Sequence, residues 1–280
     1  MGDPGDATCG AAGHGDDQDG GSRHFGEEGA RLTYNSYLRV EHLLDQQVLR
    51  SDPPAHDELL FITVHQAYEL WFKQLLHELV ATRQALLDGL LWWARHLLRR
   101  VATVENVLIH QVDIVETMTP QDFLKFRQLL APASGFQSVQ FREVEFLSGA
   151  KDPAYLERFR GLTDSERERL QLRLAEPTLW DAFLAVLDAA GLKTTDEAQT
   201  LQSLVAVAHN RREYAEIWEI AEGLLDHDAN MARWRGRHVS MVERQIGTKS
   251  GTGGSTGSPY LRARIGLRFY PLLWELRSAL

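Results

Sequence analysis

Two histidines in separate helical segments are the side chains of this chain best suited to redox chemistry. His65 lies in the apolar segment 58–71, and His238 lies in the segment 228–247. Neither has a cysteine or a cluster of carboxylates beside it. Catalytic zinc usually takes three protein ligands at close spacing, whereas haem iron needs one axial imidazole and an open opposite face. The pair therefore favours a haem over a zinc ion.

The surroundings of His65 fit a pocket for a flat aromatic ligand. Phe61 precedes His65 by one helical turn, so the two rings share a face of the helix. An aromatic ring beside a titratable imidazole suits such a ligand. The commoner alternative is a core histidine hydrogen-bonded to a backbone carbonyl, and in either case we expect His65 to be at least partly buried.

A second candidate group lies in the segment 123–138. Phe123 and Arg127 share a helical face, and a guanidinium beside aromatic rings can bind a ligand carboxylate through two hydrogen bonds. The alternative is a solvated arginine, or one paired with Glu116 or Asp122. Gly135, in the sequence Ser134-Gly-Phe-Gln-Ser138, allows close approach of the backbone to a ligand.

The region around His238 offers further groups. Arg235 and Arg237 can meet the propionates of a haem or can be solvated. A glycine-rich run, Gly251 to Gly257, follows the helix. It lacks the Lys-Ser/Thr ending of a phosphate-binding loop and follows a helix rather than a strand. It is either a plain flexible linker or a mobile lid whose Thr252 reaches a ligand.

Composition limits the class of protein. The chain has 280 residues, 44% of them hydrophobic, which is enough for a substantial core. The net charge of −9 argues against a nucleic-acid partner and against an acidic membrane surface. The single cysteine, Cys9, permits no disulfide within the chain. No signal peptide and no apolar run of membrane-spanning length is visible. We expect a soluble, cytoplasmic protein.

The spacing of apolar residues predicts an all-α fold, a bundle of long helices. Residues 1–30 read as a disordered tail, and 31–280 as a single helical domain. Heavy charge over about 152–227 suggests a peripheral helical insert. No alternating strand pattern and no internal repeat is present. The expected helices cover residues 40–47, about 57–88, 91–118, 119–130, 137–147 and 228–247, with a terminal helix that starts at Pro259 or Pro271.

Taken together, the motifs resemble the tryptophan 2,3-dioxygenase family, in order from Leu32 to the C-terminus. The resemblance is specific because the motifs are long and numerous. They are Leu32-Thr-Tyr-Asn-Ser-Tyr-Leu38, His56-Asp-Glu-Leu-Leu-Phe-Ile-Thr-Val-His-Gln66, Glu69-Leu-Trp71, Leu76-His-Glu-Leu79, Glu116-Thr-Met-Thr-Pro120, Phe126-Arg127, Ser134-Gly-Phe-Gln-Ser138, Glu145-Phe-Leu147, Arg237-His238 and Lys249-Ser-Gly-Thr-Gly-Gly-Ser255.

The resemblance implies an all-helical protein with b-type haem that assembles as a homotetramer, uses ferrous iron and O2, and acts on L-tryptophan to give N-formylkynurenine. His238 is then the axial iron ligand, and His65 is the catalytic histidine that meets the indole N–H. Arg127 holds the substrate carboxylate, and Thr252 contacts its ammonium and carboxylate end. The resemblance further places Phe61, Ile62, Thr63, Val64 and Phe123 at the substrate, Ser134 and Gly135 at the haem, and Tyr34 and Tyr37 in a neighbouring subunit's site.

Three departures from the family pattern leave the substrate open. Asn35-Ser36 stands where many members have Gly-Gly or Gly-Ser, Phe123 replaces a tyrosine of some members, and Thr63-Val64 is less apolar than usual. The alternative function is a biosynthetic oxygenase of a substituted, for example methylated, tryptophan that inserts one oxygen atom to give an oxindole. A non-catalytic haem or tryptophan sensor is a third possibility, disfavoured because binding haem requires none of His65, Arg127 or Thr252.

Overall fold

The computed structural model describes residues 32–159, 161–252 and 257–280, so the tail predicted over residues 1–30 lies outside the described part. These residues form helices and no strand, which confirms the all-α prediction. Two compact units divide the chain, one ending at Gln46 and one running from Gln47 to Leu280. The helices are α1 (Tyr34–Leu38), α2 (Val40–Leu44), α3 (His56–Leu87), α4 (Leu91–Glu116), α5 (Pro120–Phe126), the 3-10 turns η1 (Arg127–Leu130) and η2 (Gly135–Gln137), α6 (Val139–Ser148), α7 (Ala154–Arg158), α8 (Asp164–Ala175), α9 (Leu179–Ala189), α10 (Glu197–His209), α11 (Ala215–Ile246), α12 (Ser258–Ala263) and α13 (Pro271–Ala279).

The first unit contributes the two short helices α1 and α2. Thr33 caps α1 through a capping box with Ser36. Neither helix has a buried residue. Tyr34 and Tyr37 are 75% and 70% exposed. Five-residue helices are not stable by themselves in water.

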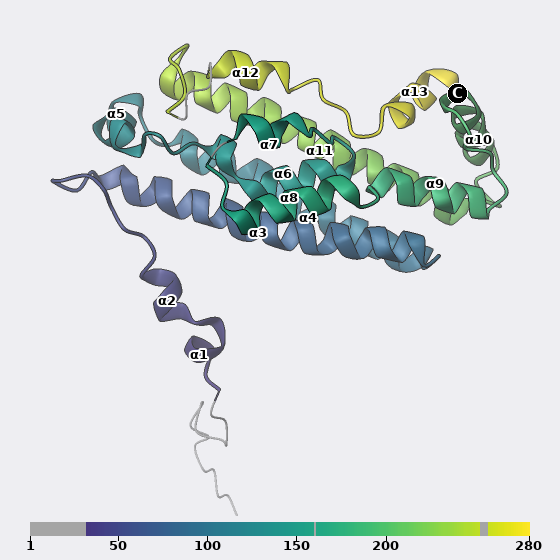
Figure 1. The fold of residues 1–280 in the computed structure, drawn as a ribbon, viewed down its shortest axis with the longest axis horizontal. Helices are drawn as coiled ribbons and strands as arrows, with labels where there is room; N and C mark the ends of the chain where they lie inside the picture. Colours follow the sequence, from purple (N-terminus) through teal and green to yellow (C-terminus); the bar gives the residue numbers. More distant parts are fainter. Residues whose placement is uncertain (1–31, 160, 253–256) are drawn as a thin grey trace, which may run out of the picture. The chain divides into compact units, whose positions relative to one another are not determined.

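Three long helices, α3, α4 and α11, form the core of the second unit and run lengthwise along it (Figure 1). Both α3 and α11 pack along α4. The central cluster of buried side chains takes Leu75 and Leu79 from α3, Leu98 and Leu108 from α4, and Leu224 from α11. Because α4 contacts both neighbours over much of its length, it fixes the relation of α3 to α11.

Local sequence signals set the ends of these helices. Gly89, at φ +70°, makes the turn from α3 to α4 in a left-handed conformation that favours glycine, directly after the expected end of that helix at about residue 88. Thr119 caps α5 by accepting a hydrogen bond from the Asp122 backbone N–H, and Pro120 occupies the first turn. Within the described residues, no helix is both long and apolar enough to span a bilayer.

Buried polar side chains tie α4, α6 and α11 together. The His227 ring on α11 contacts the Glu105 carboxylate of α4 through Nδ1 and the Ser148 hydroxyl of α6 through Nε2, the latter at 2.8 Å. Asn230 Nδ2 donates to the other Glu105 oxygen at 3.1 Å. Burial raises the pKa of Glu105. Since unpaired buried polar groups are costly, this network holds the three helices in one relative position.

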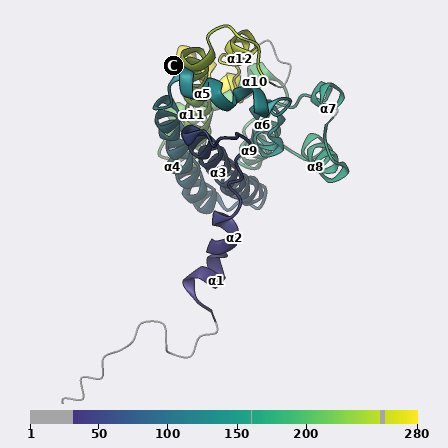
Figure 2. The same ribbon diagram turned by 90° about the vertical axis from the view of Figure 1, so that its left-hand side faces the viewer.

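The segment 152–227, predicted to be a peripheral insert, divides into parts of different character. Residues 215–227 belong to α11, which starts thirteen residues before the predicted helix at 228. Helix α9 packs on α3, with Phe183 fully buried in the central cluster. Helices α7 and α8 project to one side of the bundle (Figure 2) and pack on α6 around Tyr155 and Leu170, while the peripheral insert as a whole stays a prediction. Charged residues on the exposed face of α11 hid the apolar stripe of its first turns from the sequence analysis, whereas α9 carries only Asp181 and Asp188.

The close approach of α11 to α4 yields a stability prediction. A Cβ added at Gly223 would lie 3.0 Å from Leu98 Cδ1 and 3.2 Å from Leu98 Cβ. We expect Gly223→Ala to lower the free energy of unfolding by about 1–3 kcal/mol, since added core volume forces side chains and backbone apart. Gly236→Ala on the same helix is the control, because its Cβ would meet nothing within 4 Å. The control should be neutral or stabilising by up to about 1 kcal/mol. Equal urea midpoints for the two variants would contradict the tight α4–α11 contact.

Candidate active site

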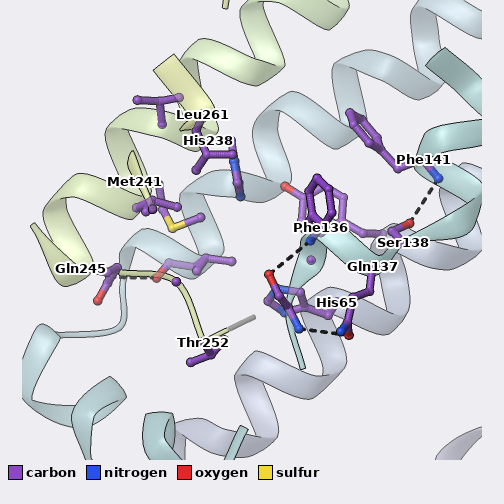
Figure 3. Close-up of a pocket in the computed structure, with 18 of the residues that line it drawn as sticks. His65, Phe136, Gln137, Ser138, Phe141, His238, Met241, Gln245, Thr252 and Leu261 are labelled. Carbon is purple, nitrogen blue, oxygen red and sulfur yellow. Dashed lines mark hydrogen bonds between the residues drawn. The ribbon is translucent and has the colours of Figure 1, made fainter. Parts of the chain in front are cut away.

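A cavity of about 600 Å³ lies between α3 and α11 and is bordered by α5, η2, α6 and residues of the stretches 251–252 and 257–264. Its volume falls in the range of small-molecule and cofactor sites, roughly 300–1,000 Å³. His65 and His238 enter it from α3 and α11, and Thr252 enters from the loop after α11 (Figure 3). The cavity therefore brings together the two histidines that the sequence places 173 residues apart.

His65 is held in one tautomer by its own helix. Its Nδ1 lies 2.7 Å from the Phe61 carbonyl oxygen, and a carbonyl can only accept, so Nδ1 carries the proton. Burial lowers the pKa of His65, an effect that the Phe61 hydrogen bond and the nearby Glu69 charge only partly offset. The ring is therefore neutral at pH 7, and its Nε2 is an unprotonated acceptor. The exposed surface of this side chain faces the cavity that it lines, and the protein around the cavity keeps the ring away from bulk water.

His238 is the second neutral imidazole of the site. Burial, and to a smaller extent the facing His65, lowers its pKa to about 4. Its ring stacks on Trp234, one turn earlier on α11, with centroids 5.2 Å apart and planes 10° apart. A neutral imidazole fixed in orientation is the form that ligates a metal. Among residues 32–159, 161–252 and 257–280, no three His, Cys, Asp or Glu side chains cluster to hold a bare ion.

One end of the cavity combines aromatic rings with a cation. Phe61 lies against His65 at 4.0 Å and is stacked with Phe123 at 5.6 Å, centroid to centroid. Arg127 lines the same end and donates to the Ser250 carbonyl oxygen. The predicted alternative pairing of Arg127 is wrong, because Asp122 pairs with Lys125, and Glu116 pairs with Arg237 and Arg244.

The loop after α11 reaches this end of the cavity. Thr252 Oγ1 donates to the Ala133 carbonyl oxygen at 2.6 Å, beside Ser134 and Gly135 in the cavity wall. A Cβ added at Gly135 would meet nothing within 4 Å, so the backbone there borders open space. Residues 253–256 of the predicted lid lie outside the described residues.

Two arginines flanking His238 have different surroundings. Arg235 is buried and lines the cavity. Arg237 is on another side of α11 and pairs with Asp113 and Glu116 of α4. Of the two predicted contacts with a cofactor carboxylate, only Arg235 is in position to make one.

Several predicted site residues are not at the cavity. Ile62, Thr63 and Val64 are absent from its wall, which corrects the prediction for all three. The 3.6-residue period of the helix explains the error, because the cavity face of α3 carries 61, 65, 68, 69 and 72. Val64 is instead buried, and its carbonyl accepts from Gln111 Nε2 at 2.8 Å. Tyr34 and Tyr37 belong to the other unit, and their role stays a prediction.

Sequence reasoning missed a large part of the wall. The same helical period, started from His65 and His238, would have found the residues one or two turns away on α3 and α11. The rest come from η2, α6 and the segment after α11, and only the folded chain brings them in. The missed residues include Tyr68, Glu69, Phe72, Phe136, Phe141, Arg142, Glu145, Trp234, Met241, Gln245, Tyr260, Leu261 and Arg264.

Comparison with known proteins agrees with this geometry. The model of the family described as tryptophan 2,3-dioxygenase matches residues 16–200 and 195–280. A protein from Nocardioides sp. named tryptophan 2,3-dioxygenase is 65% identical over 260 residues, which cover 91% of this chain and 97% of the relative. Proteins of the same name from Herpetosiphon aurantiacus and Anaeromyxobacter dehalogenans are 46% and 40% identical, over 89% and 90% of this chain and 98% and 97% of their own lengths. The chain therefore belongs to the tryptophan 2,3-dioxygenase family of oxidoreductases.

Proposed function

We propose that the protein is a haem-dependent dioxygenase that adds both atoms of O2 across the indole 2,3-bond of L-tryptophan to give N-formylkynurenine. The observation that carries the proposal is the state of His65. Its Nε2 is an unprotonated acceptor that faces an aromatic-lined cavity, and the complementary donor of a tryptophan side chain is its indole N–H. Arg127 at the same end supplies the cation for an amino-acid carboxylate.

The residues present fit a b-type haem. His238 offers a neutral imidazole, while His65 lies on a different helix that lines the same cavity and can leave the opposite face open. The wall is mostly apolar and aromatic, and the backbone at Gly135 leaves space for a flat ring. Ferrous haem held in this way supplies the capacity to bind and activate O2, and the protein supplies orientation.

Different side chains bind the two ends of the substrate. Phe61 and Phe123 form an aromatic wall against which an indole can pack. His65 accepts the indole N–H and so orients the ring, while Arg127 and Thr252 position the amino-acid end. The electron-rich indole needs no strong base, so a neutral histidine that only accepts a hydrogen bond is sufficient. An apolar cavity also keeps bulk water from the reacting atoms.

We further propose that the protein is a homotetramer in which the first unit packs on a neighbouring subunit. Helices α1 and α2 bury none of their residues, and Tyr34, Tyr37 and Leu44 are more than two-thirds exposed. Exposed apolar side chains on short helices are typical of a segment that is ordered by a partner. The tyrosines are the residues that we expect to reach a neighbour's cavity.

The function is tested by reducing the protein without oxygen, adding L-tryptophan and then O2, and reading the product mass. Two added oxygen atoms are expected. A single added atom would overturn dioxygenation and support the alternative that yields an oxindole. No product from tryptophan, but product from a ring- or side-chain-methylated tryptophan, would move the substrate to that alternative.

Replacing His238 tests the iron ligand. We expect His238→Ala to lose the spectrum of five-coordinate, histidine-ligated haem, because the described cavity has no other imidazole on α11. His110→Ala, which removes an exposed histidine of α4, should leave the spectrum unchanged. An unaltered spectrum in His238→Ala would show that another residue ligates the iron.

Replacing Arg127 tests carboxylate recognition. Removing one partner of a buried charge pair costs about 2–5 kcal/mol of binding. Arg127→Leu should therefore weaken the binding of L-tryptophan by that amount. The binding of tryptamine, which has no carboxylate, should change very little. Arg244→Leu, on an exposed arginine outside the cavity, is the control for loss of charge. Equal losses for both ligands in Arg127→Leu would rule out the assigned role.

Replacing His65 separates orientation from proton transfer. His65→Ala should retain haem and lose about 1–3 kcal/mol of transition-state stabilisation, the worth of one orienting hydrogen bond. A substrate methylated on the indole nitrogen should bind poorly to the unaltered protein and with a much smaller penalty to the variant. Because burial holds the pKa of His65 below 6.5, kcat/KM should be level above that pH and fall only in acid. An inactive variant that still binds tryptophan normally would require His65 to transfer a proton.

A further inference from the structure

A buried cluster of three arginines around one glutamate forms part of the cavity wall. Arg142 of α6, Arg235 of α11 and Arg264, which follows α12, all donate to the carboxylate of Glu145. Arg142 and Arg235 are each 5% exposed, and Glu145 is 1% exposed. The distances from Arg235 and Arg264 to the carboxylate are 3.2 and 3.3 Å. One carboxylate cannot neutralise three guanidinium groups, so the cluster carries an excess of positive charge.

Hydrogen bonding in the cluster is also incomplete. The Nε atoms of Arg142 and Arg235 are buried and have no partner among the described residues. Aromatic rings cover parts of both guanidinium groups, with Tyr155 4.4 Å from Arg142 and Phe269 5.0 Å from Arg235. Unsatisfied buried donors on a charged group are costly and call for an acceptor.

Asp228 offsets only part of the excess positive charge, by acting on Arg235 through space. Its Oδ2 accepts from the backbone N–H groups of Phe269 and Tyr270 and from Trp274 Nε1, and its buried Oδ1 has no partner among the described residues. Burial lowers the pKa of Arg235, and the charge of Arg264 lowers it further, so the cluster is electrostatically unfavourable as it stands. In the whole described wall, four arginines face two glutamates.

We propose that Arg142, Arg235 and Arg264 bind the two propionate carboxylates of the haem, and so determine which edge of the porphyrin lies against α6 and α11. The inference rests on the proposed haem function. The three arginines outnumber the carboxylates of Glu145 and Asp228 that act on them, so the cluster complements the negative charge of the propionates, and guanidinium groups bind carboxylates through charge-assisted hydrogen bonds. Arg235 lies one turn before His238 on α11, so the iron ligand and the propionate site share one face of one helix.

The proposal is tested first on the unaltered protein, by titrating protein freed of haem with haem and with haem dimethyl ester, whose propionates are uncharged. Both should give a histidine-ligated spectrum, and the ester should bind at least about 30-fold more weakly, the lower bound for a buried charge pair that loses one partner. Equal affinities with an intact spectrum would overturn the propionate site and leave the haem function standing. If neither porphyrin gives that spectrum, the haem function itself fails, and this inference fails with it.

Variants then locate the site. Arg235→Gln and Arg142→Gln should each speed the transfer of haem to excess apomyoglobin by about tenfold or more and reduce the preference for haem over its ester. Arg264→Gln is the variant that we expect to disturb folding least, because the Arg264 side chain is 29% exposed and is the least buried of the three. Arg237→Gln on α11 is the matched control, with its pairing to Asp113 outside the cavity. Full preference for haem over the ester in a folded Arg264→Gln, or loss of that preference in Arg237→Gln, would contradict the assignment.

Discussion

The packing of α3 and α11 along α4 is the constraint on which the rest of the structure depends. Each imidazole of the site belongs to one of the two outer helices, and α4 fixes the relation between those helices. Gly223 allows α11 to approach Leu98 closely, and the buried Glu105–His227 contact fixes the position of the same helix about three turns before His238. A shift of either outer helix by one residue would rotate a histidine out of the cavity, since successive residues differ by about 100° around the helix axis. The tight packing of α3 and α11 on α4 therefore fixes the positions of the two histidines in the cavity.

Electrostatics divides the cavity into regions with different tasks. Burial keeps both imidazoles neutral, and the hydrogen bond from His65 to the Phe61 carbonyl then decides which ring nitrogen is free. Cations are confined to two places, Arg127 at the aromatic end and the cluster around Glu145. A net charge of −9 over the whole chain thus coexists with a positive cavity. In a medium of low dielectric constant, such local charges outweigh distant surface charges.

The sequence was informative where a single helix carries the signal. The period of apolar residues predicted α3 to within one residue at each end, and the spacing of Phe61 and His65 predicted their shared face. Sequence patterns led to wrong or missing predictions where several elements form the cavity wall, and where one face of a buried helix is charged. Arg142, Arg235 and Arg264 lie 93 and 29 residues apart along the chain, so no local pattern could join them around Glu145. Ile62, Thr63 and Val64 were assigned as a run, although only every third or fourth residue of a helix can face one cavity.

The contact between Arg127 and the Ser250 carbonyl makes ligand recognition an exchange reaction. A carboxylate that arrives at this guanidinium displaces a neutral backbone acceptor from the loop after α11. The guanidinium is charged with either acceptor, but a carboxylate adds a full opposite charge and can accept two parallel hydrogen bonds, so an anion wins this competition and an uncharged group does not. The Ser250 carbonyl thereby competes with any ligand for Arg127, and a ligand must bind the guanidinium more strongly than this carbonyl does. Discrimination against neutral indoles is built into the unliganded protein, before any contact with the indole ring is made.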